Sequence, residues 1–277
     1  MSSDLFKLQT DQAKVKFKYR LKKAYRNLIF SLSASENPLF LAYCRHIYKP
    51  KPGTIEVFLD KFSREHKNIT FLQVGANDGF INDPLHMFIK RDNWNGVLLE
   101  PQPEVFNEYM SKLHRKRPGI IPLNAALDRE DGTRPIYKMA ISTERWAHGL
   151  SSFSREVLEK KIDDGSMTKN IRRQGVILPE RREDYITSEE IRTISPDTLL
   201  KYFGGKNLDL LAIDTEGFDY EILKMLDLDR ISPEVIIYEE AVFDEATKAE
   251  CRGYLESHGY TCRSLHRDVL AVRESAG

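Results

Sequence analysis

Polar or glycine-rich residues follow each of five predicted strands, at the point where the strand ends. In chain order they are Gly75–Gly79, Glu100, Asn124, Asp214 with Glu216, and Glu239 with Glu240. Because ligands of open α/β sheets bind at the carboxyl ends of the strands, we expect these residues to line one site. A carboxylate after the second strand is the usual acceptor for two ribose hydroxyls. The combination predicts a ligand of the adenosine type.

The turn Gly75-Ala76-Asn77-Asp78-Gly79 separates two classes of cofactor. A strand, a glycine turn and a helix bring bare backbone amides against a nucleotide. Dinucleotide-binding turns have the pattern G-x-G-x-x-G, whereas this turn lacks the middle glycine and carries Asp78. The Asp78 carboxylate would repel a pyrophosphate but suits the cationic methionine end of S-adenosylmethionine. The turn therefore favours S-adenosylmethionine over NAD.

A general base would assist methyl transfer to a hydroxyl group, because a hydroxyl has a high pKa. The candidates are Asp214, Glu216, Glu239, Glu240 and His148. Asp214 is the first choice because it directly ends the fourth strand, although an aspartate there also caps helices. Glu239 and Glu240 cannot both face the site, since consecutive strand residues point to opposite faces. His148 is either a base or an exposed loop residue.

A divalent metal is the open question at the end of the fourth strand. Asp214, Glu216 and Asp219 offer carboxylate oxygens of the kind that Mg²⁺ accepts. Their spacing resembles no tight metal-binding loop, and a helix start explains the acidic residues equally well. We therefore predict no metal site, and we expect Asp219 to complement the helix dipole.

Strands alternate with helical patterns from residue 69 onward, which predicts an α/β fold with a parallel sheet and helices on both faces. The expected strands are 69–74, 96–100, 120–123, 208–213 and 235–238, an added antiparallel strand at 134–141, and a closing antiparallel pair at 260–263 and 269–272. This main domain is predicted to span residues 66–277, after a helical N-terminal arm at 1–65.

Residues 142–195 interrupt the alternation with a polar, charged segment that lacks strong periodicity. A long irregular insertion in a compact domain is either disordered or functional. We expect a lid that folds over the pocket. Its Trp146, serine and arginine residues suit polyhydroxylated or anionic acceptors.

The N-terminal arm carries a basic, amphipathic stretch at residues 14–30. Phe17, Leu21, Ala24 and Leu28 fit a helical stripe. One interpretation is a surface for peripheral contact with a membrane or an acidic partner. The alternative is a helix packed on the main domain, or on a second subunit of a homo-oligomer, with a solvated Lys/Arg face.

Composition limits the classes of partner and compartment. Lys+Arg and Asp+Glu both number 42, and this zero net charge argues against a dedicated nucleic-acid binder. Cys44, Cys251 and Cys262 lack C-x-x-C spacing, so we expect reduced thiols rather than disulfides or a zinc site. The start lacks the apolar segment of a secretory signal, and no run is long enough to span a bilayer. We expect a cytoplasmic protein.

Four motifs, in their order and spacing, resemble the FkbM-type methyltransferases. They are Val74–Gly79, Leu99–Pro103, Leu123–Ala126, and Leu210–Gly217 followed by Glu221–Leu223. The resemblance covers about residues 69–240. It implies a Rossmann-like class I methyltransferase fold with a mostly parallel seven-stranded sheet. It also implies S-adenosylmethionine as the cofactor and O-methylation of hydroxyls of sugars or other natural products.

The resemblance also implies roles for individual residues. It puts Gly75, Ala76, Asn77 and Gly79 around the methionine portion of the cofactor and Glu100 on the ribose. It puts Asn124 and Ala125 near the adenine and Asp214 at the methyl-transfer end. We include Pro101 and Gln73 among the cofactor-binding residues. The family often has an aspartate where this chain has Gln73, whose amide forms hydrogen bonds but carries no charge. Our hypothesis is that Asp78 supplies that charge.

The prediction is thus an O-methyltransferase that acts on a small polyhydroxylated acceptor, such as a sugar or a glycosylated metabolite. One rival is an NAD-linked oxidoreductase, which Asp78 and the missing glycine disfavour. The other is a non-catalytic scaffold that binds through the basic arm and has a degenerate pocket. A binding titration distinguishes the three hypotheses. The methyltransferase would bind only S-adenosylhomocysteine, the oxidoreductase only NADH, and the scaffold neither.

Overall fold

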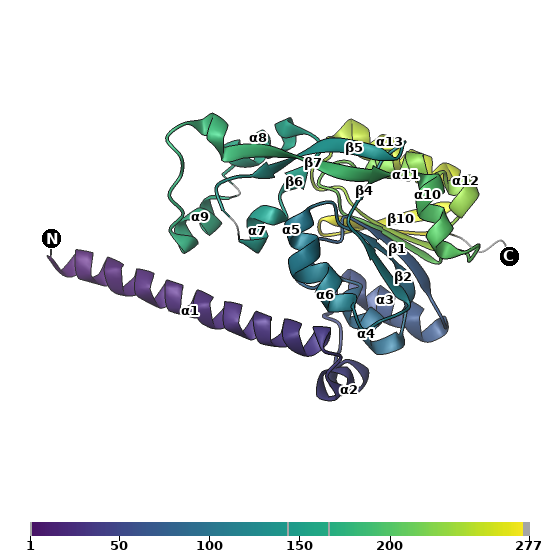
Figure 1. Cartoon of the computed structure of the whole chain (residues 1–277), viewed down its shortest axis with the longest axis horizontal. Coiled ribbons are helices and arrows are strands. Elements are labelled where there is room, and N and C mark those ends of the chain that lie inside the picture. The colour runs from purple at the N-terminus through teal and green to yellow at the C-terminus, as the bar shows by residue number, and fades with distance from the viewer. Residues whose placement is uncertain (1, 143, 166, 274–277) are drawn as a thin grey trace.

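A seven-stranded sheet forms the centre of the computed structural model, which describes residues 2–142, 144–165 and 167–273 (Figure 1). The strand order is β10-β11-β9-β8-β1-β2-β3. The strands are β1 (Thr70–Val74), β2 (Asn95–Leu99), β3 (Ile120–Leu123), β8 (Leu210–Ile213), β9 (Val235–Glu239), β10 (Tyr260–Leu265) and β11 (Asp268–Arg273). Neighbours from β9 to β3 pair in parallel, whereas β11 pairs antiparallel with both β9 and β10. The predicted α/β fold is confirmed, and its sheet is mixed.

Helices cover both faces of this sheet because its inner strands are apolar on both sides. Phe71 packs in one core with helices α3 and α4, whereas its neighbour Leu72 packs in the other with α11 and α13. The helices around the sheet are α3 (Ile55–Glu65), α4 (His86–Asp92), α5 (Pro103–Val105), a π-helical turn (Phe106–Met110), α6 (Ser111–His114), α10 (Pro196–Leu200), a 3-10 turn (Lys201–Phe203), α11 (Asp219–Leu226), α12 (Leu228–Ile231) and α13 (Glu245–Ser257).

A second sheet of four strands, in the order β4-β7-β5-β6, lies over the carboxyl ends of the first. It contains β4 (Ala126–Leu127), β5 (Gly132–Met139), β6 (Ser151–Ser152) and β7 (Ile186–Ile194). The helices between these strands are α7 (Arg145–His148), α8 (Arg155–Asp163), α9 (Thr168–Gln174) and a 3-10 turn (Arg182–Tyr185). The expectation of an irregular segment at 142–195 is therefore wrong. The sequence of β7 lacks the alternating pattern that predicts a strand, because its buried residues Ile186, Ile191 and Ile194 are not regularly spaced. The antiparallel strand expected at 134–141 is confirmed as β5.

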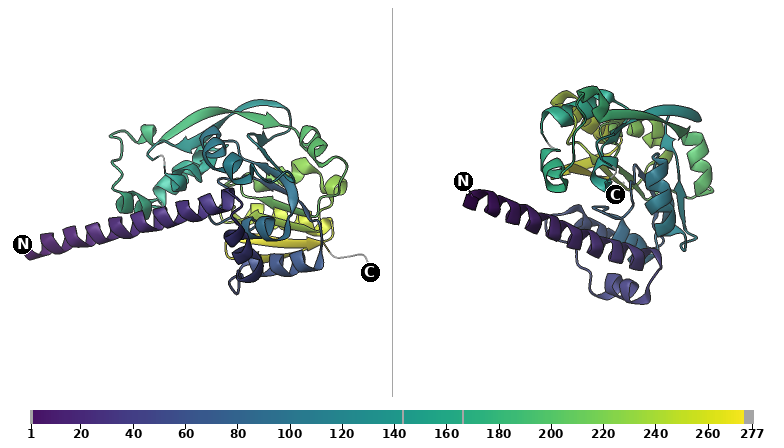
Figure 2. Two further views of the ribbon diagram at one scale, coloured as in Figure 1. Left: turned by 60° about the horizontal axis from the view of Figure 1, so that its bottom comes forward. Right: turned by 60° about the vertical axis from the view of Figure 1, so that its left-hand side comes forward.

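The N-terminal arm begins with the long helix α1 (Ser2–Ala34), followed by α2 (Pro38–His46). Helix α1 projects beyond the body of the molecule, and only its C-terminal part packs against the body (Figures 1 and 2). Within the described residues, no helix is long and apolar enough to cross a membrane.

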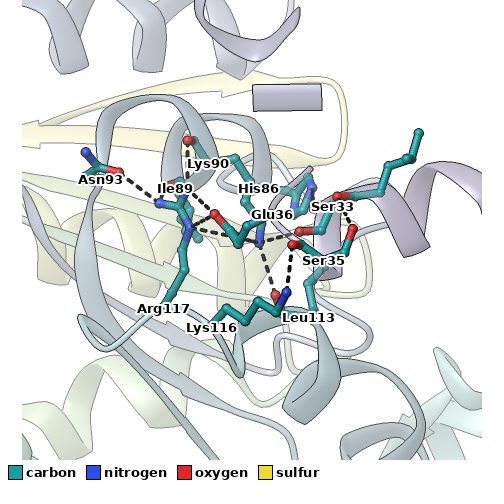
Figure 3. Close-up of polar contacts among 11 residues, drawn as sticks. Ser33, Ser35, Glu36, His86, Ile89, Lys90, Asn93, Leu113, Lys116 and Arg117 are labelled. Atoms are coloured by element: carbon teal, nitrogen blue, oxygen red, sulfur yellow. Dashed lines mark hydrogen bonds and ion pairs between the residues drawn. The ribbon is translucent and has the colours of Figure 1, made fainter. Parts of the chain in front are cut away.

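A buried lysine attaches the end of α1 to the body (Figure 3). The Lys90 ammonium is fully buried and donates to the Ser33 carbonyl (3.1 Å), the Glu36 carboxylate (2.5 Å) and the Leu113 carbonyl (3.0 Å). Arg117 pairs with the same Glu36 carboxylate (2.8 Å). These contacts join α1, α4 and α6, so the arm has a defined direction relative to the sheet.

Candidate active site

The glycine turn lies where the carboxyl ends of β1, β2 and β8 meet. The amides of Gly75 and Ala76 both donate to the carbonyl of Leu99 (3.0 and 2.9 Å). Gly75 has φ +79°, and a Cβ there would lie 2.0 Å from the carbonyl oxygen of Asp214. Only glycine allows this approach, so Gly75 lets the turn pack directly against the end of β8.

Glu100 holds this turn and its own loop in place. Its carboxylate accepts from the amide of Asn77 (2.8 Å) and from the amide of Gln102 (2.8 Å). Burial raises the pKa of Glu100 to about 7. The Gln102 side chain also donates to the carbonyl of His148 (2.8 Å), which links the turn to helix α7. Gln102 Nε2 donates to Glu100 Oε1 as well (3.3 Å), so the free lone pair of Oε2 is the acceptor left for a ligand hydroxyl.

An apolar slot adjoins Glu100. Its lining includes Val74, Leu99, Pro101, Ala125, Ala126, Leu127, Ile136, Phe153 and Ile222. Pro101 and Ala125 are thus part of the lining of this apolar slot. Asn124 lies beside the slot, and its amide group donates to the carbonyls of Glu100 and Pro101 (2.9 and 3.0 Å). Its predicted contact with adenine stays a prediction. Gln102, Ala126, Leu127 and Phe153 also line the slot, and no motif of the sequence singles them out as site residues.

A second cavity opens from the same turn and has a polar wall. Gln73 lies in this wall and donates to Asp83 (3.3 Å), while its own Oε1 is buried and has no hydrogen-bond partner among the described residues. Burial, reinforced by the Asp78 carboxylate, raises the pKa of Asp83 to about 6. An unsatisfied acceptor in a wall that also contains the Asp78 and Asp83 carboxylates suits a ligand that carries an ammonium group.

Asp78 and Asp83 also organise the backbone around this wall. Asp78 accepts from the amides of Phe80 and Ile81 (2.8 and 2.7 Å), which closes the turn after Gly79. Asp83 accepts from the amide of Leu85 (2.7 Å), as a helix cap does. Helix α4 begins three residues later, at His86.

Three carboxylates gather where the two cavities meet. Ligand oxygens of Asp214, Glu216 and Glu239 lie within 4.8 Å of one another. Glu216 pairs with Lys161 of α8, and Glu239 pairs with Arg267 (2.5 Å). This cluster differs from the acidic set considered for a metal, which included Asp219. A metal ion could be held at such a spacing, but two members already have cationic partners, and the absence of a metal stays a prediction.

The electrostatics of this cluster raise two of its pKa values. Desolvation of the Asp214 carboxylate by the surrounding protein, followed by the charge of Glu239, raises the pKa of Asp214 well above its usual value. The Asp214 side chain is nevertheless open to the cavity. Burial, followed by the charge of Glu216, raises the pKa of Glu239 to about 7. Carboxylates with raised pKa values accept protons more readily near neutral pH.

Asp219, Glu240 and His148 occupy different positions. Asp219 is fully buried and accepts from the Thr215 hydroxyl (2.7 Å) and the Glu239 amide (3.1 Å), so it shapes the loop. Glu240 points to the opposite face and pairs with Arg252 (2.8 Å), as expected for consecutive strand residues. His148 lines the apolar slot from α7.

A cleft of about 500 Å³ separates α1 from helices α7 and α9, and we call it the arm cleft. It is bridged by the Tyr19 hydroxyl, which donates to Glu144 (2.9 Å) and accepts from Gln174 (3.0 Å). Arg26 and Trp146 line both the arm cleft and the second cavity. The N-terminal arm therefore forms one wall of a path that leads to the carboxylate cluster.

Comparison with known proteins identifies the family. The methyltransferase FkbM domain family matches residues 73–262. The chain belongs to the FkbM methyltransferase family. It is accordingly a methyltransferase, and its cofactor is S-adenosylmethionine. A search of curated proteins found no match.

Solved structures similar to this FkbM methyltransferase include other methyltransferases. The N-terminal domain of human METTL16, in complex with S-adenosylhomocysteine, has 9% sequence identity and a TM-score of 0.37, and the alignment covers 83% of this chain and 73% of that one. The precorrin-6y C5,15-methyltransferase from Geobacter metallireducens has 14% identity and a TM-score of 0.37, with 82% and 93% of the two chains covered.

Proposed function

We propose that this FkbM methyltransferase transfers a methyl group to a hydroxyl of a small polyhydroxylated acceptor, a sugar or a glycosylated metabolite. One observation carries the proposal. The Asp214 carboxylate has a raised pKa and lines both cavities that meet at the glycine turn. A base is therefore available where the methionine end of the cofactor would lie.

The cofactor site follows from the same geometry. Glu100 would bind a ribose hydroxyl, and the slot beside Pro101 and Ala125 would hold the adenine. The glycine turn, with Gly75 and Asn77 in the cavity lining, would pack against the methionine portion, and the cofactor's ammonium group would complete the hydrogen bonds of Gln73 Oε1. When bound, the cofactor supplies an activated methyl group on a sulfonium.

Asp214 would act on the acceptor rather than on the cofactor. The Asp214 carboxylate would accept the proton of the acceptor hydroxyl, whose oxygen would take the methyl group that bound S-adenosylmethionine supplies, with S-adenosylhomocysteine as the leaving product. Alignment of oxygen, carbon and sulfur provides much of the rate, and a positioned base adds roughly 10²–10⁴-fold. Lys161 and Arg267 orient the neighbouring carboxylates, which can accept hydrogen bonds from further hydroxyls.

The arm cleft supports a sugar-like acceptor. Tyr109 and Trp146 offer aromatic faces for the C–H surface of a sugar ring, while Asn170 and Arg26 offer planar polar groups for its hydroxyls. The mixed charge of the lining, with Lys22 and Glu108 both present, suits a neutral polyhydroxylated molecule.

The test is mass spectrometry of products formed from a panel of sugars, glycosides and other hydroxylated metabolites. With the acceptor identified, we expect Asp214→Asn to lower kcat by roughly 10²–10⁴-fold while the Kd of S-adenosylhomocysteine stays nearly unchanged. Asp197→Asn is the control, because Asp197 lies on the surface in an ion pair with Arg230. Full activity of Asp214→Asn would contradict the assignment of the base, and His148→Gln and Glu239→Gln would then locate it.

Binding measurements separate this proposal from its rivals. The proposal requires that S-adenosylhomocysteine binds and that NADH does not. Binding of NADH alone would indicate an oxidoreductase, and binding of neither would indicate a scaffold with a degenerate pocket.

A further inference from the structure

Helix α1 exposes a row of large apolar side chains. Leu21, Tyr25 and Leu28 are 55%, 65% and 57% exposed, and their spacing places them on one stripe of the helix. The opposite side of α1 contacts the body through Tyr19, which bonds to Glu144, and through Phe30, whose ring packs against Phe80. The apolar stripe therefore points away from the body.

The same helix concentrates positive charge. Between Asp11 and Glu36 the sequence has no acidic residue, and its basic residues are Lys14, Lys16, Lys18, Arg20, Lys22, Lys23 and Arg26. The side chains of Lys18, Arg20 and Lys22 are exposed beside the apolar stripe. Because the whole chain has no net charge, this segment is a strong local excess.

Helix α2 extends this surface. Leu39, Tyr43 and Ile47 are 81%, 44% and 65% exposed and also share one side of a helix. Helices α1 and α2 lie together on the side of the molecule away from the second sheet (Figures 1 and 2). We call the exposed sides of these two helices the arm face.

We propose that the arm face docks on the surface of an anionic lipid bilayer. Apolar side chains flanked by lysine and arginine are the composition of helices that lie in the bilayer interface. The leucine and tyrosine side chains would enter the headgroup region, while the basic side chains bind lipid phosphates. A second copy of the chain fits less well, because two identical basic faces repel each other. A nucleic acid would engage the charges but would leave the apolar stripe in water.

The test is co-sedimentation of the full chain with vesicles of phosphatidylcholine, with or without phosphatidylglycerol. We expect binding only to the anionic vesicles and weaker binding at high salt. The double variant Leu21→Gln, Leu28→Gln should bind these vesicles at least about tenfold more weakly, since it removes two apolar side chains that would be buried at the bilayer interface. Ile177→Gln is the control, because Ile177 is 93% exposed but lies outside the arm.

Binding of S-adenosylhomocysteine and circular dichroism report whether each variant is folded. Equal binding to both kinds of vesicle, or unchanged binding by the double variant, would overturn the proposal. So would a wild-type dimer that the double variant abolishes without any vesicle binding. Salt-sensitive binding to an RNA oligonucleotide in the absence of vesicle binding would assign the face to nucleic acid instead.

Discussion

Gln73 is the residue at which this chain departs from the pattern expected of its family. Its amide donates to Asp83, and its buried Oε1 has no partner in the described part of the chain. Asp78, our first candidate for the missing charge, is committed through one oxygen to the amides of Phe80 and Ile81. Asp83 is therefore a second candidate for the charge that faces the cofactor ammonium.

Substitution of each aspartate by asparagine separates these two candidates. Asparagine keeps an oxygen that can accept from the turn amides, but it removes the charge. We expect Asp83→Asn to weaken S-adenosylhomocysteine binding by about tenfold or more, since a hydrogen bond to a charged group contributes about 1.5–3 kcal/mol. Isothermal titration calorimetry measures the change. A loss in Asp78→Asn alone would return the role to Asp78, and no loss in either variant would contradict both assignments.

At the scale of elements, the attachment of α1 depends on one buried ammonium. Lys90→Ala removes the donor to Glu36 and to the carbonyls of Ser33 and Leu113. We expect the free energy of unfolding to fall by about 3–5 kcal/mol, as it does when one partner of a buried ion pair is removed. Urea denaturation measures it. Lys116→Ala is the control, because Lys116 bonds to Ser35 at the exposed surface, and an equal loss there would contradict the prediction.

Helix α8 contributes a cation to the carboxylate cluster. Lys161 pairs with Glu216 and lowers the pKa of Glu239. Its removal should raise the pKa of Glu239 and leave the Glu216 charge beside Asp214 without its cation, so the rising limb of the pH profile of kcat should move to higher pH. A rise of one unit in the pKa of the base would reduce kcat by about tenfold at pH values below that pKa. The profile of Lys161→Ala, measured with the identified acceptor, tests this. The exposed neighbour Lys160 provides the control, and an unshifted limb in Lys161→Ala would refute the prediction.

For the whole molecule, buried acids predict how stability depends on pH. Burial raises the pKa values of Glu100 and Glu239 to about 7 and those of Asp83 and Asp219 to about 6. At pH values between the ordinary and the raised pKa values of these acids, the folded chain binds more protons than the unfolded chain. Stability therefore decreases as pH rises through this range.

We expect the Tm of the cofactor-free protein to be several degrees lower at pH 8 than at pH 5.5, by this linkage. Scanning calorimetry measures the difference. Glu100→Gln removes one of the titrating groups and should reduce it, whereas the exposed Asp197→Asn should not. A Tm that rises with pH over this interval would contradict the burial of these acids.

The sequence alone predicted the strands and the residues at their ends. Apolar runs such as Thr70–Val74 and the turn at Gly75 are local patterns, and strands that alternate with helices pair in parallel. Parallel pairing then brings Glu100 and Asp214 to the same edge, whatever the details of packing. The family resemblance rested on these same local motifs.

The tertiary structure decided which of those polar groups have partners. Asp214 and Asp219 look alike in the sequence, yet Asp219 is buried in loop hydrogen bonds while Asp214 is open to the cavity. The cation beside Glu216 comes from Lys161, 55 positions away, through the second sheet and its helices. Such pairings depend on contacts between elements distant in the chain, which no local pattern encodes. For the same reason, only the structure showed that the stripe of α1 faces solvent instead of the body.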